Sequence, residues 1–146
     1  MEQLVKITET VIQHLGIQGA MIDVFKREDF DVVIISITHT GDIPEYFVDS
    51  ALSLAHIVRE LSGFHEYPLV VDINHIESKR LNRLQQTVAI IIDRVQSFDK
   101  EVLLPDVSSF DRMLVHGYIA RAYPTIGTRS SGEGKDRHMT IFPKRD

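Results

Sequence analysis

Residues 109–123 read SFDRMLVHGYIARAY, and this stretch predicts the helix from which the rest of the chain is interpreted. Arg112 and His116 are four residues apart in it, so their side chains share one helix face and lie one turn apart. A permanently charged guanidinium beside an imidazole makes a compact group of hydrogen-bond donors. Such a pair suits the oxygens of a phosphate or a carboxylate, provided that the flanking sequence presents it to a ligand.

Local signals mark both ends of this helix. Ser108 is followed three residues later by Asp111, a capping-box arrangement that places the helix start at Ser108 or Ser109. Pro124 ends the helix, because a proline lacks the N–H that the next turn needs. The two signals together define an element of about four turns with the basic pair near its beginning.

The residues after Pro124 predict a β-hairpin. Strands are expected over residues 125–130 and 137–142. Residues 132–135, Gly-Glu-Gly-Lys, are predicted to form the turn between them, because glycine readily adopts the positive φ angles of a tight turn. The basic side chains of this hairpin are expected to rim the surface that carries the Arg/His pair: Arg129, Lys135 and Arg137.

Hydrophobic periodicity supplies the remaining elements. Helices are predicted over residues 2–15, 42–62 and 76–98, and strands over residues 20–25, 32–38, 69–73 and 101–104. Asp42 is expected to cap the second of these helices. The fold class is therefore α+β. Residues 1–75 run helix-strand-strand-helix-strand, and they pack with residues 76–146, which run helix-strand-helix-strand-strand.

Length and composition restrict the class of protein. A chain of 146 residues fits one ordinary domain or two very small ones, and 43% hydrophobic residues can sustain a globular fold. The absence of cysteine excludes disulfides and thiolate metal sites. The N-terminus does not read as a signal peptide, and no apolar run has the roughly 18 residues of a membrane span. A cytoplasmic location is expected.

Charge is distributed unevenly along the chain. The formal net charge is −5, which by itself argues against a nucleic-acid partner. Residues 1–75 hold four basic and twelve acidic side chains, a net −8, whereas residues 76–146 hold twelve basic and nine acidic ones, a net +3. This asymmetry indicates that any anion-binding surface belongs to the second half.

Several short motifs follow one another between residues 68 and 142. They are VVDIN at 70–74, KR at 79–80, VLLP at 102–105, FDRMLVH at 110–116, YP at 123–124 and SSGEG at 130–134, before a final Arg-x-x-x-Ile strand. In this order they resemble the R-three-H domain, named for its Arg-xxx-His motif, in the form found in bacterial Jag-type proteins. The resemblance implies a small α/β domain that binds single-stranded nucleic acid, chiefly RNA, through Arg112 and His116. It also implies a bacterial post-transcriptional or cell-envelope role.

The same resemblance implies a KH-like module over residues 1–75, with the R-three-H domain over residues 76–146. A KH domain clamps the nucleic-acid backbone with a Gly-x-x-Gly loop. Asp42-Ile-Pro-Glu45 stands where that loop belongs, and its acidic residues repel phosphate. The clamp is therefore expected to be degenerate, leaving this half to support the fold, bind another protein or form a homodimer.

Four further residues are candidates for nucleic-acid contact, each with a structural alternative. Lys79, Arg80 and Arg83 form a basic cluster at the start of a predicted helix, where cations oppose the helix dipole, and the alternative explanation is a solvated helix face. Tyr123 is a candidate stacking platform or a half-buried helix cap.

The central pair has a structural alternative too. His116 can form a hydrogen bond inside the fold while Arg112 pairs with Asp111 or Asp106.

No enzymatic signature occurs in the sequence. The seven histidines form no His-x-x-x-His or His-Glu-x-x-His pattern, and neither a Walker loop nor Gly-x-Ser-x-Gly is present. The chain is expected to be no enzyme and to use neither a metal nor a cofactor. The expected function is binding of single-stranded RNA, with single-stranded DNA left open, and the alternative is a protein-interaction adaptor with little RNA affinity.

Overall fold

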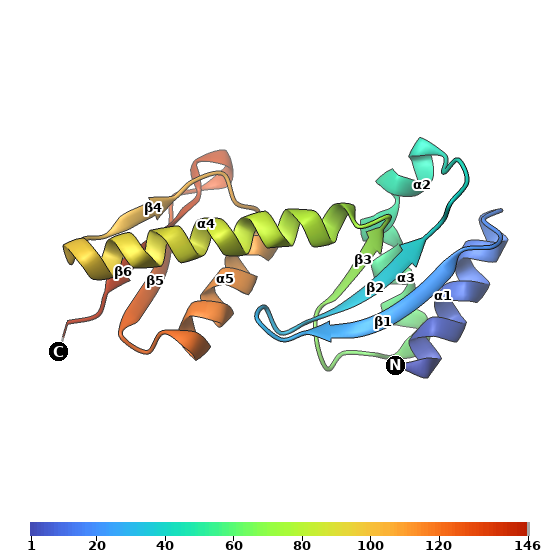
Figure 1. Ribbon diagram of the computed structural model, residues 1–146, viewed down its shortest axis with the longest axis horizontal. Coiled ribbons are helices and arrows are strands. Elements are labelled where there is room, and N and C mark those ends of the chain that lie inside the picture. Colours follow the sequence, from blue (N-terminus) through green and yellow to red (C-terminus); the bar gives the residue numbers. More distant parts are fainter. Residues whose placement is uncertain (146) are drawn as a thin grey trace. The chain divides into compact units, whose positions relative to one another are not determined.

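The computed structural model describes residues 1–145, which form two compact units. The first unit is Met1–Leu81 and the second begins at Asn82. Each contains its own three-stranded sheet with helices, as Figure 1 shows. The α+β class predicted from the sequence is thereby confirmed.

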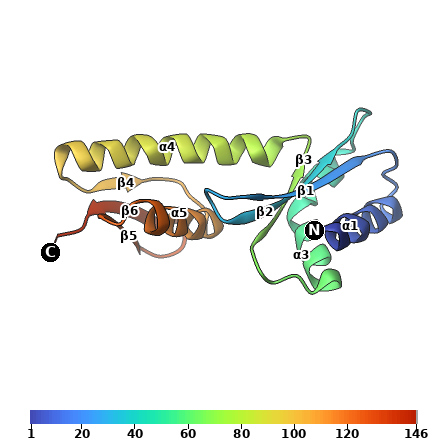
Figure 2. The ribbon, with the colours of Figure 1, turned by 60° about the horizontal axis from the view of Figure 1, so that its bottom comes forward.

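The first unit surrounds a mixed sheet with strand order β1-β2-β3. Its elements are α1 (Glu2–His14), β1 (Met21–Arg27), β2 (Val32–Thr38), α2 (Glu45–Asp49), α3 (Ala51–Ser62) and β3 (Leu69–Ile73). The strand β2 pairs antiparallel with β1 and parallel with β3, so it is the central strand. Alternate residues of β2 and β3 face the buried sides of α1 and α3, which lie against one face of the sheet (Figure 2). This apolar layer is the core of the unit.

The prediction of one helix over residues 42–62 is wrong in two respects. The helix is interrupted at Ser50, whose hydroxyl donates to the carbonyl oxygen of Phe47 at 2.7 Å and so closes α2 after one turn. Phe47 is fully buried, which fixes this short helix against the core. The N-cap position of α2 is Pro44, without a side-chain cap, so Asp42 is an exposed loop residue and not a cap.

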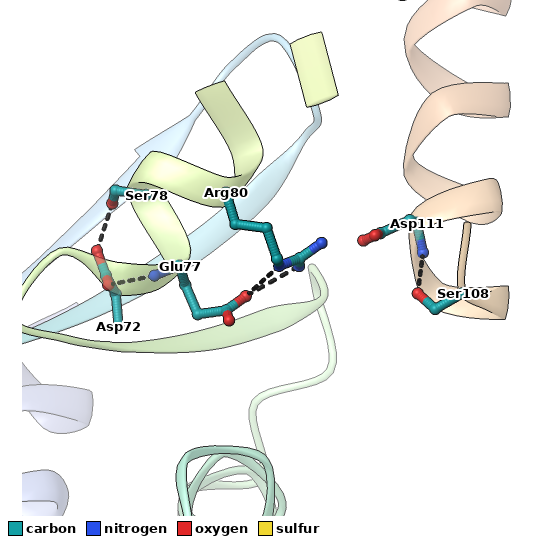
Figure 3. Close-up of polar contacts among 6 residues, drawn as sticks. All are labelled: Asp72, Glu77, Ser78, Arg80, Ser108 and Asp111. Carbon is teal, nitrogen blue, oxygen red and sulfur yellow. Dashed lines mark hydrogen bonds and ion pairs between the residues drawn. The ribbon is translucent and has the colours of Figure 1, made fainter. Parts of the chain in front are cut away.

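The long helix α4 (Ile76–Phe98) begins in the first unit and continues into the second. Its first turn is held by Asp72, the fully buried penultimate residue of β3. One carboxylate oxygen of Asp72 accepts the backbone N–H of Glu77 at 2.9 Å, and the other accepts the hydroxyl of Ser78 (Figure 3). A carboxylate at a helix N-terminus also interacts favourably with the helix dipole.

The second unit combines the remainder of α4 with an antiparallel sheet. Its other elements are β4 (Val102–Leu104), α5 (Ser109–Ala122), β5 (Ile126–Ser131), a 3-10 turn (Gly134–Asp136) and β6 (His138–Pro143). The strand order is β4-β6-β5, so β5 is an edge strand. Figure 2 shows α5 alongside this sheet. The core of the unit contains buried apolar side chains from α4, α5 and the strands: Val88, Ile92, Val95, Leu114, Val115, Ile119, Ile126, Met139 and Ile141.

The hairpin strands lie one residue later than the sequence predicted, and their connection contains the 3-10 turn. Gly132 has φ 87° and Gly134 has φ 56°, in agreement with the role expected of glycine there. A Cβ atom at Gly132 would lie 2.6 Å from the carbonyl oxygen of Asp136. Any side chain at this position would therefore force the turn to move.

Two negative findings apply to residues 1–145. No helix in this range, α4 included, is both long and apolar enough to cross a bilayer. Within the same range, no three or more His, Asp or Glu side chains converge in a way that could hold a metal ion.

Candidate nucleic-acid interface

The helix α5 begins where the sequence placed it. The hydroxyl oxygen of Ser108 accepts the backbone N–H of Asp111 at 3.1 Å, which caps the first turn (Figure 3). The helix ends at Ala122, with Tyr123 as its C-cap. Arg112 and His116 therefore lie in the first half of α5, on the side that carries Ser109 and Met113 as well.

A groove of about 640 Å³ lies between α5 and the strands β5 and β6. We call it the cationic groove, and its lining residues are Ser109, Arg112, Met113, His116, Thr128, Arg129, Ser130, Arg137 and Met139. Three arginines and one histidine belong to this set, and no carboxylate does. The groove thus brings together four of the residues that the sequence proposed for nucleic-acid contact.

Arg112 is half-buried at one wall of the cationic groove. One terminal nitrogen of its guanidinium donates to the backbone carbonyl of Val107 at 2.7 Å. Within residues 1–145, the side chain of Arg112 forms this hydrogen bond and no ion pair with Asp106 or Asp111, the partners suggested by the sequence. A guanidinium has five N–H donors, so the anchored side chain still has donors to offer to a ligand.

His116 is exposed, and its ring is fixed by a residue of the neighbouring strand. Its Nδ1 atom lies 2.5 Å from the hydroxyl oxygen of Thr128, in hydrogen-bonding contact. This bond joins the middle of α5 to β5 and orients the imidazole at the edge of the cationic groove. With Nδ1 engaged by Thr128, Nε2 is the ring nitrogen left for a ligand.

Arg129 lines the cationic groove from β5, and a neighbouring carboxylate offsets part of its charge. Its guanidinium lies 2.7 Å from a carboxylate oxygen of Glu101, and both side chains are about half exposed. The guanidinium also lies over the ring of Phe142, 5.3 Å from its centroid. Glu101 therefore competes with any phosphate for this arginine.

A second groove, of about 500 Å³, adjoins the first along its arginines. Ser109, Arg112 and Arg137 line both, and Lys135 lines only this second one, which we call the hairpin groove. Asp106 and Asp136 also belong to its lining. The hairpin groove is therefore less electropositive than the cationic groove. Lys135 shares the hairpin groove with Arg112 but does not line the cationic groove.

A small depression of about 150 Å³ adjoins the cationic groove. We call it the apolar slot, and its lining residues are His116, Ile119, Ala120, Ile126, Gly127, Thr128, Phe142 and Lys144. It shares His116 and Thr128 with the cationic groove.

Tyr123 is half-buried at the C-terminal end of α5 and lines none of these three depressions. Its ring meets that of Tyr118 edge-on, with centroids 5.9 Å apart and planes at 83°. The hydrogen bond with Tyr118, and then burial, raise the pKa of Tyr123. The geometry favours the structural alternative, a capping aromatic residue, over a stacking platform.

The basic cluster on α4 is divided between the units. Lys79 and Arg80 belong to the first unit and Arg83 to the second. Arg80 contacts Glu77 with two nitrogens, each at 2.9 Å, while Lys79 and Arg83 are exposed. These three residues stay candidates on the strength of the sequence alone.

The structure adds groove residues that sequence reasoning missed: Ser109, Met113, Thr128, Ser130 and Met139. Ser109 and Met113 share the helix face of Arg112 and His116, so helical spacing alone could have found them. Thr128 required knowledge of how β5 lies against α5, which no local pattern encodes.

Comparison with known proteins identifies the class of the second unit. Residues 82–143 match the family described as the R-three-H domain, and every residue that lines the cationic groove lies in this range. The resemblance to the R-three-H domain is thereby confirmed for this part of the chain.

A relative can then be named. The chain is similar to the RNA-binding protein KhpB of Bacillus subtilis (strain 168), with 32% identity over 78 residues. The match covers 53% of this chain and 38% of the length of that protein.

Proposed function

We propose that the protein binds single-stranded nucleic acid, RNA in particular, through the cationic groove. The observation that carries this proposal is the convergence of Arg112, Arg129, Arg137 and His116 on one groove without a lining carboxylate. Arginine contacts phosphate through paired, directed N–H groups, and imidazole adds a donor or a stacking surface. The name of the relative in Bacillus subtilis, an RNA-binding protein, supports the choice of RNA.

The proposal makes no use of a chemical reaction. Its ligand would be held by charge and by hydrogen bonds from the groove side chains. We therefore propose a binding protein and not an enzyme, acting in the cytoplasm of a bacterium as a post-transcriptional or cell-envelope regulator.

Binding of fluorescently labelled single-stranded RNA and DNA of one sequence, followed by anisotropy, tests the proposal. Replacement of Arg112 and His116 together by alanine is expected to cost roughly 1–3 kcal/mol of binding free energy, the scale of a lost base or phosphate contact. Arg94→Ala is the matched control, because Arg94 is an exposed arginine of α4 that lines none of the three depressions. Equal losses in both variants would contradict the assignment of the site.

The first unit has a different proposed role. Its elements follow the order suggested for a KH-like module except that two helices, α2 and α3, stand in place of one. The exposed Asp42 and Glu45 in place of the glycines of a clamp argue against phosphate contact there. We propose that it supports the second unit or binds a protein partner, including a second copy of the chain. If neither RNA nor DNA binds at low salt, the adaptor function replaces the RNA-binding one.

A further inference from the structure

The apolar slot differs in chemistry from the cationic groove beside it. Ile119 and Ile126 form its floor and are 1% and 2% exposed, so the floor is hydrocarbon. The charged residue of its lining is Lys144, which follows the last strand. A phosphate would lose its hydration on such a floor without enough donors to replace it. The slot therefore suits a ligand group with an apolar face and polar edges.

One wall of the slot depends on Gly127. Gly127 pairs with Phe142 across β5 and β6, and a Cβ atom at Gly127 would lie 2.6 Å from two ring carbons of Phe142. The ring consequently lies against the glycine backbone and forms part of the lining of the slot, while the guanidinium of Arg129 lies over the same ring, 5.3 Å from its centroid. Aromatic side chains are the usual contacts of unpaired nucleobases.

The rim of the slot is polar and fixed in place. The backbone N–H of Lys144 donates to the carbonyl oxygen of Thr125 at 2.8 Å, which holds the residue beside the start of β5. Thr128 contributes its hydroxyl, and the hydrogen bond between Thr128 and His116 at 2.5 Å orients the imidazole. These groups can meet the ring nitrogens and exocyclic groups of a base.

His116 and Thr128 line both the slot and the cationic groove, so the two depressions meet at this pair. We propose that the apolar slot receives one nucleobase of the bound strand, while the adjacent phosphate occupies the cationic groove. This inference rests on the proposed function and adds to it the division of the ligand between two subsites. His116 and Thr128 then contact the strand where its base and its backbone separate.

Two oligonucleotides of equal length test the inference, one of ordinary single-stranded RNA and one whose ribonucleotides are abasic, with the same phosphates. The wild-type protein is expected to bind the ordinary strand about five- to 150-fold more tightly, as expected for a stacked base. Ala120→Phe fills the slot from an exposed position on its lining and is expected to reduce this preference at least about fivefold. Its affinity for the abasic strand should stay unchanged.

Ala122→Phe provides the matched control, because Ala122 is exposed on the same helix and lines none of the three depressions. It is expected to keep the wild-type preference. If Ala120→Phe lowers the melting temperature, Ala120→Leu, which is smaller, takes its place in the comparison. Thermal unfolding of each variant distinguishes a filled slot from a damaged fold.

The outcomes separate the two proposals. Equal wild-type affinity for both strands, or an undiminished preference in the slot-filling variants, overturns the base slot while the cationic groove keeps its function. Loss of binding to both strands on replacement of Arg112 and His116, together with loss of the base preference alone in Ala120→Phe, supports both. Failure of the wild-type protein to bind either strand overturns the proposed function and the slot with it.

Discussion

At the scale of single residues, the candidate interface contains hydrogen-bonding side chains that are oriented before any ligand arrives. Arg112 is held by the carbonyl of Val107, and His116 is held by the hydroxyl of Thr128. Side chains fixed in this way lose less conformational entropy on binding than mobile surface side chains do. The same contacts identify which replacements should change affinity without removing a charge.

Thr128→Val removes the hydroxyl that orients His116 and keeps the volume and branching of the side chain. The imidazole then loses its fixed position, and the affinity for single-stranded RNA should fall by about 0.5–1.5 kcal/mol, the net value of one hydrogen bond. Anisotropy titration measures the change. In the alanine variant of His116 the same replacement should cost less, because only the contact that Thr128 itself makes with the strand is then lost. A fully additive loss would show that Thr128 acts independently of His116.

Glu101→Gln should strengthen binding. Glu101 lies 2.7 Å from Arg129, so its carboxylate competes with phosphate and repels it. Neutralising it should increase affinity by roughly 0.2–1 kcal/mol, the range of exposed ion pairs. Asp93→Asn, an exposed site on α4 outside the three depressions, removes the same charge and serves as the control. An equal gain in both variants would attribute the effect to net charge and not to Arg129.

At the scale of secondary-structure elements, the sequence was most informative where local signals and packing agree. The apolar run at residues 32–38 and the periodic run at residues 76–98 have the predicted bounds in the structure. Ser108 caps α5 because the cap is encoded within four residues.

The sequence was least informative where one contact decides between alternatives. The break at Ser50 depends on a single hydroxyl bond to Phe47 and on burial of that aromatic ring, neither of which changes the apolar periodicity of residues 42–62. The candidate site follows the same rule. Arg112 and His116 share a face by helical geometry, whereas Thr128 joins them only through the position of β5 against α5.

Ser108→Ala tests the local origin of α5. Loss of the bond to the N–H of Asp111 leaves that donor without its cap and should lower the free energy of unfolding by about 1 kcal/mol. Chemical unfolding followed by circular dichroism measures it. Ser97→Ala, an exposed position near the end of α4, should change stability by a few tenths of a kcal/mol at most. A loss as large at Ser97 as at Ser108 would contradict the capping role.

The turn between β1 and β2 should make the fold sensitive to acid. Burial alone would raise the pKa of Asp29, but the hydrogen bonds and charge of Arg27, at 2.8 and 2.9 Å, outweigh it and hold that pKa below its ordinary value of 3.8. Because the folded state binds this proton less readily than the unfolded state, the pair stabilises the fold above pH 3.8 and loses this contribution as the pH falls below it.

Asp29→Asn removes this ionisation. Its unfolding midpoint in urea should be lower than that of the wild type near neutral pH, and the difference should shrink as the pH falls to about 3, where the wild-type carboxylate is increasingly protonated too. The effect should be modest, since the pair is partly solvated. A difference that is constant over this pH range would show that the Arg27–Asp29 pair does not account for it.

At the scale of the whole molecule, the two units carry net charges of opposite sign. Residues 1–81 carry six basic and thirteen acidic side chains, a net −7, and residues 82–146 carry ten basic and eight acidic ones, a net +2. The protein as a whole is therefore anionic, although its candidate binding groove is cationic. Attraction of a nucleic acid must come from the local arrangement of a few arginines, against a repulsive net charge.

This arrangement predicts how binding depends on salt. Each phosphate neutralised on a single strand contributes about −0.7 to the slope of log K against log salt, so three groove arginines should give a slope of roughly −2. Arg137→Ala should reduce the magnitude of the slope by about 0.7, whereas the control Arg94→Ala should leave it unchanged. Titrations at several salt concentrations measure both. Equal slopes in the Arg137 variant and the wild type would mean that Arg137 contacts no phosphate, whatever its effect on affinity at one salt concentration.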